Sequence, residues 1–287
     1  MKKQRSLLAK LHTNGIYYLI GALILLLGVP LYQQLVLVPL GYSSALASSN
    51  SGDFTPYLLW IRSDSFQFVL YRTLLATAFL LLLTLPFTLF RIIVAQEILG
   101  QRERAEEEQA EARETMEAVP VEPADAKQSE AEDMPAYAWR GKGFAVIAAW
   151  SGLFGLLAYI LGTIASTFYF VVVSSGLTKR SPLPNTITTP ASVFSLITDT
   201  AGIGLLALAM LCFGAIIARS GRKLWPDVWV AFGYLALAVA ALLSGSAVAV
   251  ASFPTQGQAV LTSPAILLFA LWVLWLGIML VRLKPEA

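Results

Sequence analysis

Cysteine and histidine are almost absent from this chain. Among 287 residues there is one cysteine, Cys212, and one histidine, His12, which lies in a basic leader. A single cysteine excludes an internal disulfide and a thiolate metal cluster, and a single histidine excludes the paired-histidine metal motifs. Because His12 lies in the leader, no histidine is placed to act as the base of a catalytic serine. The sequence also has no G-x-S-x-G or P-loop pattern. We therefore predict no enzyme activity, no catalytic residue, no cofactor and no metal site.

Charge is scarce as well. Charged residues make up 13% of the chain and hydrophobic residues 57%, with a mean hydropathy of +0.68. A soluble core does not hide that much apolar surface, so the composition indicates an integral membrane protein whose main partner is the lipid bilayer. The net charge of +2 combines an acidic segment with basic residues at the ends of apolar runs. It gives no indication of nucleic-acid binding.

The clearest spanning segment is residues 73–90, which contain no charge and lie between Arg72 and Arg91. At about 1.5 Å per residue, that interval is close to the roughly 30 Å hydrocarbon thickness of a bilayer. Both arginines can reach the headgroup layers. The helical pattern continues beyond Arg91 to about Val119, which predicts one rod that crosses the membrane and ends in water.

Five other apolar runs complete the prediction of an all-α, polytopic transmembrane bundle. They cover residues 16–40, 143–173, 189–219, 226–251 and 263–282. Pro30 is a candidate kink in the first run. Thr189-Pro190 and Ser263-Pro264 have the form of a helix cap followed by a first-turn proline. Small residues at helical spacing predict close helix packing at Ser151, Gly155, Gly162 and Ser166, and at Ala236, Ala240, Ser244, Ala247 and Ala251.

An acidic segment divides the six spans into a 2 + 4 grouping. Residues 101–135 hold twelve Asp or Glu against four Lys or Arg. Charge pairs four residues apart favour a helix to about Val119. The stretch that follows has the composition of a disordered tether. A heptad pattern typical of a coiled region is present but weak. We expect a leader, two spans and an outer loop in residues 1–99, an acidic arm and tether in 100–138, and a four-helix bundle in 139–287. The arm either binds a protein partner or serves as a solvated spacer.

Lysine and arginine near the span ends predict the orientation. One side has only Arg62, Arg72, Lys179 and Arg180, and the other collects Lys2, Lys3, Arg5, Lys10, Arg91, Arg140, Lys142, Arg219, Arg222, Lys223, Arg282 and Lys284. The positive-inside rule then places both termini and the acidic arm in the cytoplasm of a multi-pass plasma-membrane protein. Two alternatives remain open. The first run can be a signal peptide cleaved after Ala47 rather than an anchor, and residues 41–66 can be an outer loop with an interfacial piece or an ordinary packed loop.

The candidate site rests on Asp199, an acid among apolar neighbours, which is costly in a span unless it is paired or hydrated. Asp199 lies twenty residues before Arg219, so it reaches nearly the same depth as Arg72. We hypothesise that Arg72 and Asp199 meet near the outer headgroups, with Gln33 and Gln34 beside them and Thr198 and Thr200 as further polar neighbours. This cluster is either the mouth for a polar solute or ion, or an ion pair that fixes helix register. Two functions follow: a non-enzymatic component of a membrane assembly with a cytoplasmic interaction arm, or a small-molecule or ion permease. The lack of ionisable residues at the midplane weakens the second.

Overall fold

The structure is a computed structural model that describes residues 2–50, 53–98, 100, 136–177, 185–252 and 262–282. Every regular element in these residues is helical, and none is a strand. Six helices are long and apolar enough to cross a membrane: Ala9–Leu37, Ser65–Ile98, Gly143–Gly176, Ile187–Ser220, Asp227–Ser252 and Thr262–Arg282. The all-helical, six-span prediction is thereby confirmed. The acidic arm, residues 101–135, lies outside the described residues.

The first span stays helical through Pro30 but changes its winding twice. It consists of α1 (Lys2–Leu23), the π-helical η1 (Ile24–Gly28), α2 (Val29–Tyr32) and the π-helical η2 (Gln33–Leu37). A proline removes one backbone N–H, and a wider π turn accommodates the unpaired carbonyl. Where the sequence predicts a kink at Pro30, the structure has two π-helical stretches, one on each side of the proline.

The second span is not one uninterrupted rod. It consists of α5 (Ser65–Leu81), a turn at residues 82–84 and a helix over residues 85–98. The amides of Leu82, Leu83 and Leu85 bond to carbonyls three residues earlier, at 3.1, 3.1 and 2.9 Å. Pro86 explains the break, because it has no N–H to donate and disfavours helical geometry in the residue before it.

The remaining helices cover the predicted runs, and two of them begin earlier than predicted, at Ala136 and at Asn185. They are α7 (Ala136–Gly176), the continuous series α8 (Asn185–Ser195), η3 (Leu196–Gly202) and α9 (Ile203–Ser220), then η4 (Gly221–Lys223), α10 (Asp227–Ser252) and α11 (Thr262–Arg282). The fourth span begins at Asn185, so Pro190 lies inside α8 rather than at its first turn. The last begins at Thr262, within one residue of the predicted start.

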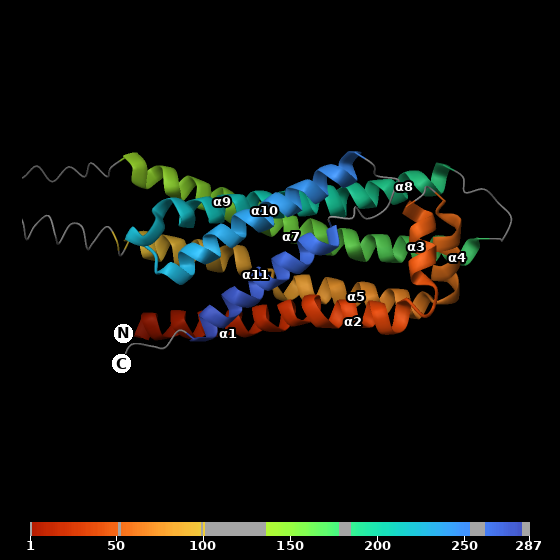
Figure 1. Ribbon diagram of the computed structural model, residues 1–287, viewed down its shortest axis with the longest axis horizontal. Coiled ribbons are helices and arrows are strands. Elements are labelled where there is room, and N and C mark those ends of the chain that lie inside the picture. Colours follow the sequence, from red (N-terminus) through yellow and green to blue (C-terminus); the bar gives the residue numbers. More distant parts are fainter. Residues whose placement is uncertain are drawn as a thin grey trace, which may run out of the picture.

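The six spans form a closed ring in chain order. Each of α1, α5, α7, α9, α10 and α11 packs on the next, and α11 packs on α1. Gly15 and Gly277 permit this last contact, since a Cβ on Gly277 would lie 2.9 Å from Leu19 and 3.1 Å from the Gly15 carbonyl. In the elongated bundle of Figure 1, α1 begins and α11 ends at the same end. We call it the terminal end.

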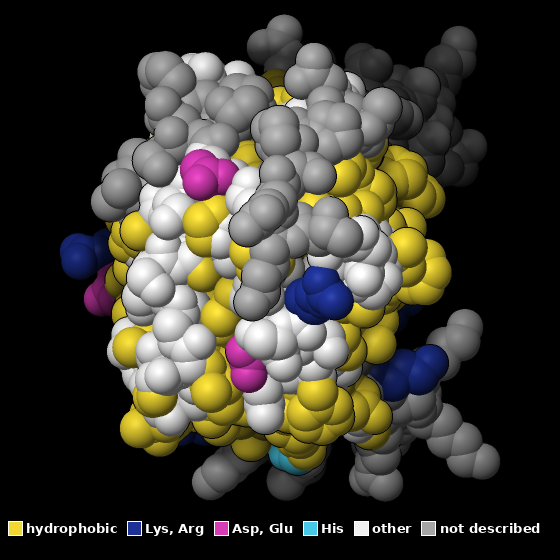
Figure 2. Space-filling model, turned by 90° about the vertical axis from the view of Figure 1, so that its right-hand side faces the viewer, with side chains coloured by type: hydrophobic (Ala, Val, Ile, Leu, Met, Phe, Trp, Pro, Cys, Tyr) yellow, Lys and Arg dark blue, Asp and Glu magenta, His cyan; other side chains and the backbone are white. Residues whose placement is uncertain are grey.

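Two short helices lie across the opposite end, which we call the capped end (Figure 1). They are α3 (Tyr42–Asn50) and α4 (Thr55–Ser63), and they fill the region expected to be an outer loop. Leu58 and Ile61 of α4 are buried, and the Trp60 indole N–H donates to the Leu40 carbonyl at 2.8 Å. Amphipathic α4 therefore packs on the bundle. Seen end-on in Figure 2, the capped end shows polar side chains and backbone across much of its face, with hydrophobic side chains at its flanks.

Candidate functional site: a cavity at the capped end

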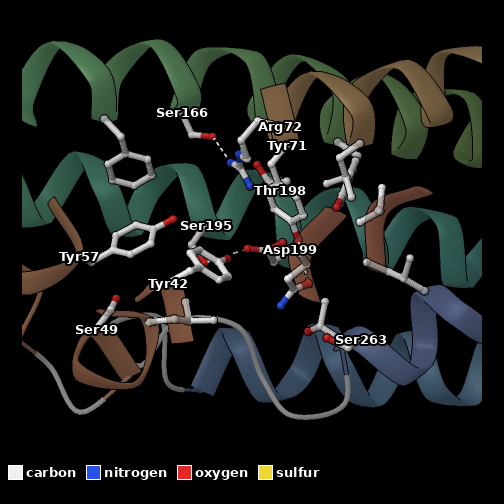
Figure 3. A pocket seen from close by; sticks show the side chains of 18 of the residues that line it. Tyr42, Ser49, Tyr57, Tyr71, Arg72, Ser166, Ser195, Thr198, Asp199 and Ser263 are labelled. Carbon is white, nitrogen blue, oxygen red and sulfur yellow. Dashed lines mark hydrogen bonds between the residues drawn. The ribbon is translucent and has the colours of Figure 1, made fainter. Parts of the chain in front are cut away.

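A cavity of about 310 Å³ lies inside the ring near the capped end. It is partly open, and its walls come from the first span, α3, α4, α5, α7, α8, η3 and α11 (Figure 3). All four residues of the candidate site, Arg72, Asp199, Gln33 and Gln34, line this one cavity. The structure thus places one cation, one acid and two amides around a shared space.

Arg72 is held in place by hydroxyl groups of α7. Its Nη2 donates to Ser166 Oγ at 2.6 Å, and its Nε donates to Thr167 Oγ1 at 3.2 Å. Both hydroxyls in turn donate to the Thr163 carbonyl, at 3.1 and 2.6 Å. The guanidinium carbon also lies 5.9 Å from the centre of the Phe68 ring, within cation–π range. The bond to Ser166 is visible in Figure 3.

Asp199 lies in the π-helical η3 and has a separate partner. It accepts a hydrogen bond from Ser195 Oγ, one helical turn earlier, at 3.2 Å. The expected ion pair with Arg72 is not formed. In the parts of the chain that the structure describes, the only Lys or Arg within 4.0 Å of an acid is Arg222, beside Asp227 at the surface. The two cavity charges therefore remain available to a ligand.

The remaining polar residues of the cluster differ in their surroundings. Gln33 Oε1 accepts a long hydrogen bond, 3.5 Å, from the Tyr71 hydroxyl, whereas Gln34 is exposed. Thr198, on the cavity wall, and Thr200 have buried hydroxyls that make no hydrogen bond with the described residues. Thr198 is only 4% exposed. The site thus contains polar groups with unused hydrogen-bonding capacity.

Four tyrosines give the cavity an aromatic lining that sequence reasoning missed: Tyr42, Tyr57, Tyr71 and Tyr159. They come from four different helices, so no local motif could reveal them. Burial raises the pKa of Tyr57 to about 12, with the Arg72 charge acting in the opposite direction, and burial raises the pKa of Tyr42 well above its usual value. Both hydroxyls are therefore protonated at neutral pH and can donate hydrogen bonds.

Stacked aromatic side chains close the cavity toward the terminal end. The Tyr159 ring lies 4.2 Å from that of Phe79, and Phe79 in turn stacks on Phe269 at 6.2 Å. Trp272 continues the stack, 6.1 Å from Phe269 and 4.6 Å from Phe232, and its indole N–H donates to the Phe232 carbonyl. These rings form a floor, so the cavity does not run through the bundle.

Three π-helical stretches border the cavity. Leu25 of η1, Gln33 of η2 and Asp199 of η3 all line it. A π turn widens a helix and leaves backbone groups with altered partners, and such turns are frequent at functional sites. Sequence reasoning anticipated an irregularity only at Pro30.

A second polar cluster lies in the half of the bundle toward the terminal end, beside the break at residues 82–84. The Tyr18 hydroxyl, fully buried, bonds to Thr84 Oγ1 at 2.9 Å and to Thr88 Oγ1 at 2.7 Å. Asn14 Nδ2 donates to the same Thr88 hydroxyl at 3.0 Å. This neutral network ties α1 to the interrupted second span.

Comparisons with known proteins find no protein-family model, no curated protein and no solved structure that matches this chain. Functional inference therefore rests on the geometry of the cavity.

Proposed function

We propose that this chain is a small-solute permease that binds a zwitterionic solute in the capped-end cavity. The observation that carries the proposal is that Arg72 and Asp199 line one cavity of about 310 Å³ without pairing. Charges within a span are costly and mark solute or ion pathways when they face a cavity. A solute with an anionic group for Arg72 and a cationic group for Asp199 satisfies both charges at once.

Irregular helices favour a permease over a static receptor. Transporters place solute sites where helices are discontinuous, because such helices expose backbone groups and change shape at low cost. Here three π-helical stretches border the cavity, and the second span is interrupted at residues 82–84. The aromatic floor is the barrier that has to rearrange for solute to pass toward the terminal end.

For the topology, we propose that the terminal end faces the cytoplasm of a plasma-membrane protein, with both chain termini and the acidic arm on that side and the spans grouped 2 + 4 around the arm. Basic residues support this orientation: Arg91, Arg219, Arg222 and Arg282 lie in helix segments toward the terminal end. An impermeant maleimide added to intact cells is expected to label Asp53→Cys at the capped end and not Arg222→Cys. The reverse labelling contradicts the orientation.

The proposal for the cavity is tested with ligands that carry one charge or two. Purified protein in detergent is heated with glycine and other zwitterionic amino acids, with inorganic phosphate, and with choline. We expect an increase in melting temperature with zwitterions only. Uptake of the stabilising amino acid into proteoliposomes then tests transport.

Matched variants identify the residues responsible. Arg72→Gln and Asp199→Asn each remove one cavity charge and are expected to abolish the stabilisation. Arg222→Gln removes a charge from the exposed Arg222–Asp227 pair and serves as the control. Equal stabilisation of the wild type, Arg72→Gln and Asp199→Asn contradicts the proposal.

A second candidate role, as the non-enzymatic component of a membrane assembly, concerns residues 101–135. Their twelve acids against four bases favour a basic protein partner. Affinity capture with the full chain and with residues 101–135 deleted tests this role. An unchanged set of captured proteins contradicts it.

A further inference from the structure

A groove of about 470 Å³ runs along the side of the bundle between α5 and α7. Its α5 wall contains Val69, Arg72, Thr73, Ala76, Thr77 and Leu80, and its α7 wall contains Ile160, Ile164, Thr167, Phe168 and Val171. The α5 positions recur at intervals of three and four residues, so they form one continuous helix face. The groove is distinct from the cavity inside the ring, and Arg72 is the residue that lines both.

The groove faces outward and is mostly apolar. Phe168 is 73% exposed, and Leu80 and Ile164 are each 55% exposed. In a membrane these side chains contact lipid rather than water. From Arg72 to Leu80, α5 rises by about 12 Å, which covers most of the roughly 15 Å depth of one hydrocarbon leaflet. The groove therefore has the length and surface chemistry that suit a single acyl chain.

Arg72, Thr73 and Thr167 lie in the part of the groove nearer the capped end, and Thr77 lies about one helical turn deeper. Arg72 uses Nε for Thr167, on the groove wall, and Nη2 for Ser166, on the cavity wall. Its Nη1 makes no hydrogen bond within the described part of the chain. The exposed hydroxyls of Thr73 and Thr77 likewise make none there. A cation and two free hydroxyls beside an apolar channel are complementary to an anionic headgroup with an attached acyl chain.

We propose that this groove binds one anionic phospholipid from the leaflet at the capped end. The lipid phosphate contacts Arg72 and the hydroxyl of Thr73, and one acyl chain lies over Ala76 toward Leu80. Such a lipid supplies the hydrogen-bond acceptors that Arg72 Nη1 lacks. It also seals the α5–α7 contact that separates the cavity from the bilayer. The site does not depend on the cavity being a solute site.

Native mass spectrometry of the protein released from nanodiscs tests the proposal. The nanodiscs contain phosphatidylglycerol and phosphatidylcholine in equal amounts. We expect one phosphatidylglycerol retained per wild-type chain, at least tenfold in preference to phosphatidylcholine. Arg72→Gln is expected to remove this preference, and Thr77→Trp, which fills the groove, is expected to reduce retention of both lipids. Ala238→Phe, at an exposed position on α10, is the matched control and retains the lipid.

The outcomes separate this proposal from the solute site. Asp199→Asn alters the cavity alone, so it is expected to lose the solute and keep the lipid. Thr77→Trp alters the groove alone, and it tests the lipid even where Arg72→Gln fails to fold. Equal retention of the two lipids by the wild type, or unchanged phosphatidylglycerol retention in Thr77→Trp, overturns the lipid site.

Discussion

The structure predicts that Arg72 is coupled more strongly to the hydroxyls of α7 than to Asp199. A double-mutant cycle measures each coupling separately. Arg72→Met keeps the length of the side chain while removing its donors, and it is combined in turn with Ser166→Ala and with Asp199→Ala. Because the Arg72–Ser166 bond is 2.6 Å long and no ion pair joins Arg72 to Asp199, the two cycles are expected to differ.

The magnitudes follow from measured interhelical hydrogen bonds. Neutral bonds between membrane helices contribute about 0.6 kcal/mol on average, with a maximum of about 1.7. A charged donor roughly doubles the strength of a bond, so we expect a coupling of about 1.2 kcal/mol between Arg72 and Ser166. Arg72 and Asp199 line the same cavity without an ion pair, so the coupling between them is expected to be smaller than that between Arg72 and Ser166.

The assay is the free energy of unfolding in mixed detergent micelles, measured for the wild type, the three single variants and the two double variants. A coupling above about 1 kcal/mol between Arg72 and Asp199 refutes the separation of the two charges. A coupling of zero between Arg72 and Ser166 refutes the role of α7 in holding the guanidinium. The first result also weakens the solute site, because charges that neutralise each other need no ligand.

Three further predictions concern stability. Gly162→Ala places a Cβ against the Thr198 hydroxyl of η3 and is expected to lower the free energy of unfolding by about 1–3 kcal/mol, whereas Gly143→Ala meets nothing within 4 Å and is its control. Tyr18→Phe removes two interhelical hydrogen bonds and is expected to cost about 1 kcal/mol, against no loss for the exposed Tyr17→Phe; equal melting temperatures of the two variants contradict this. In the folded protein, burial raises the pKa of Tyr57 to about 12, whereas in the unfolded chain a tyrosine ionises near pH 10. Between these two pH values only the unfolded chain loses this proton. Stability is therefore expected to fall between pH 10 and 12 by up to about 1.4 kcal/mol per pH unit, and Tyr57→Phe is expected to lack this part of the decline.

The spans were predictable because hydrophobic length and flanking charge are local properties of the sequence. Their internal irregularities were not. Pro86 stands in an uninterrupted apolar run, so it did not mark a boundary, yet its missing N–H breaks the second span. Pro190 was taken for a helix start although the helix begins five residues earlier. In both cases tertiary contacts decide whether a proline begins, bends or interrupts a helix.

The spacing of small residues predicted the packed face of α10 only in part. On α10 the alanines at 236, 240 and 247 are buried, whereas Ser244 and Ala251 are exposed. Steps of four residues drift by about 40° each from the 3.6-residue period, so a stripe with that spacing leaves the packed face. The sequence predicts that Arg72 and Asp199 lie at nearly the same depth in the membrane, and in the structure both line one cavity. Depth alone did not reveal the α7 hydroxyls that hold Arg72, because those contacts depend on which helices are neighbours.

Closure of the ring by α1 and α11 has a consequence for biosynthesis. Gln33 and Ser263 line the cavity from helices that lie far apart in the sequence, Gln33 from η2 and Ser263 from α11. A chain interrupted before residue 262 has an open circle of helices and lacks the α11 wall of the cavity. Formation of the cavity therefore has to wait for the synthesis of α11, and until then the face of α1 around Gly15 is open to lipid and to other membrane proteins.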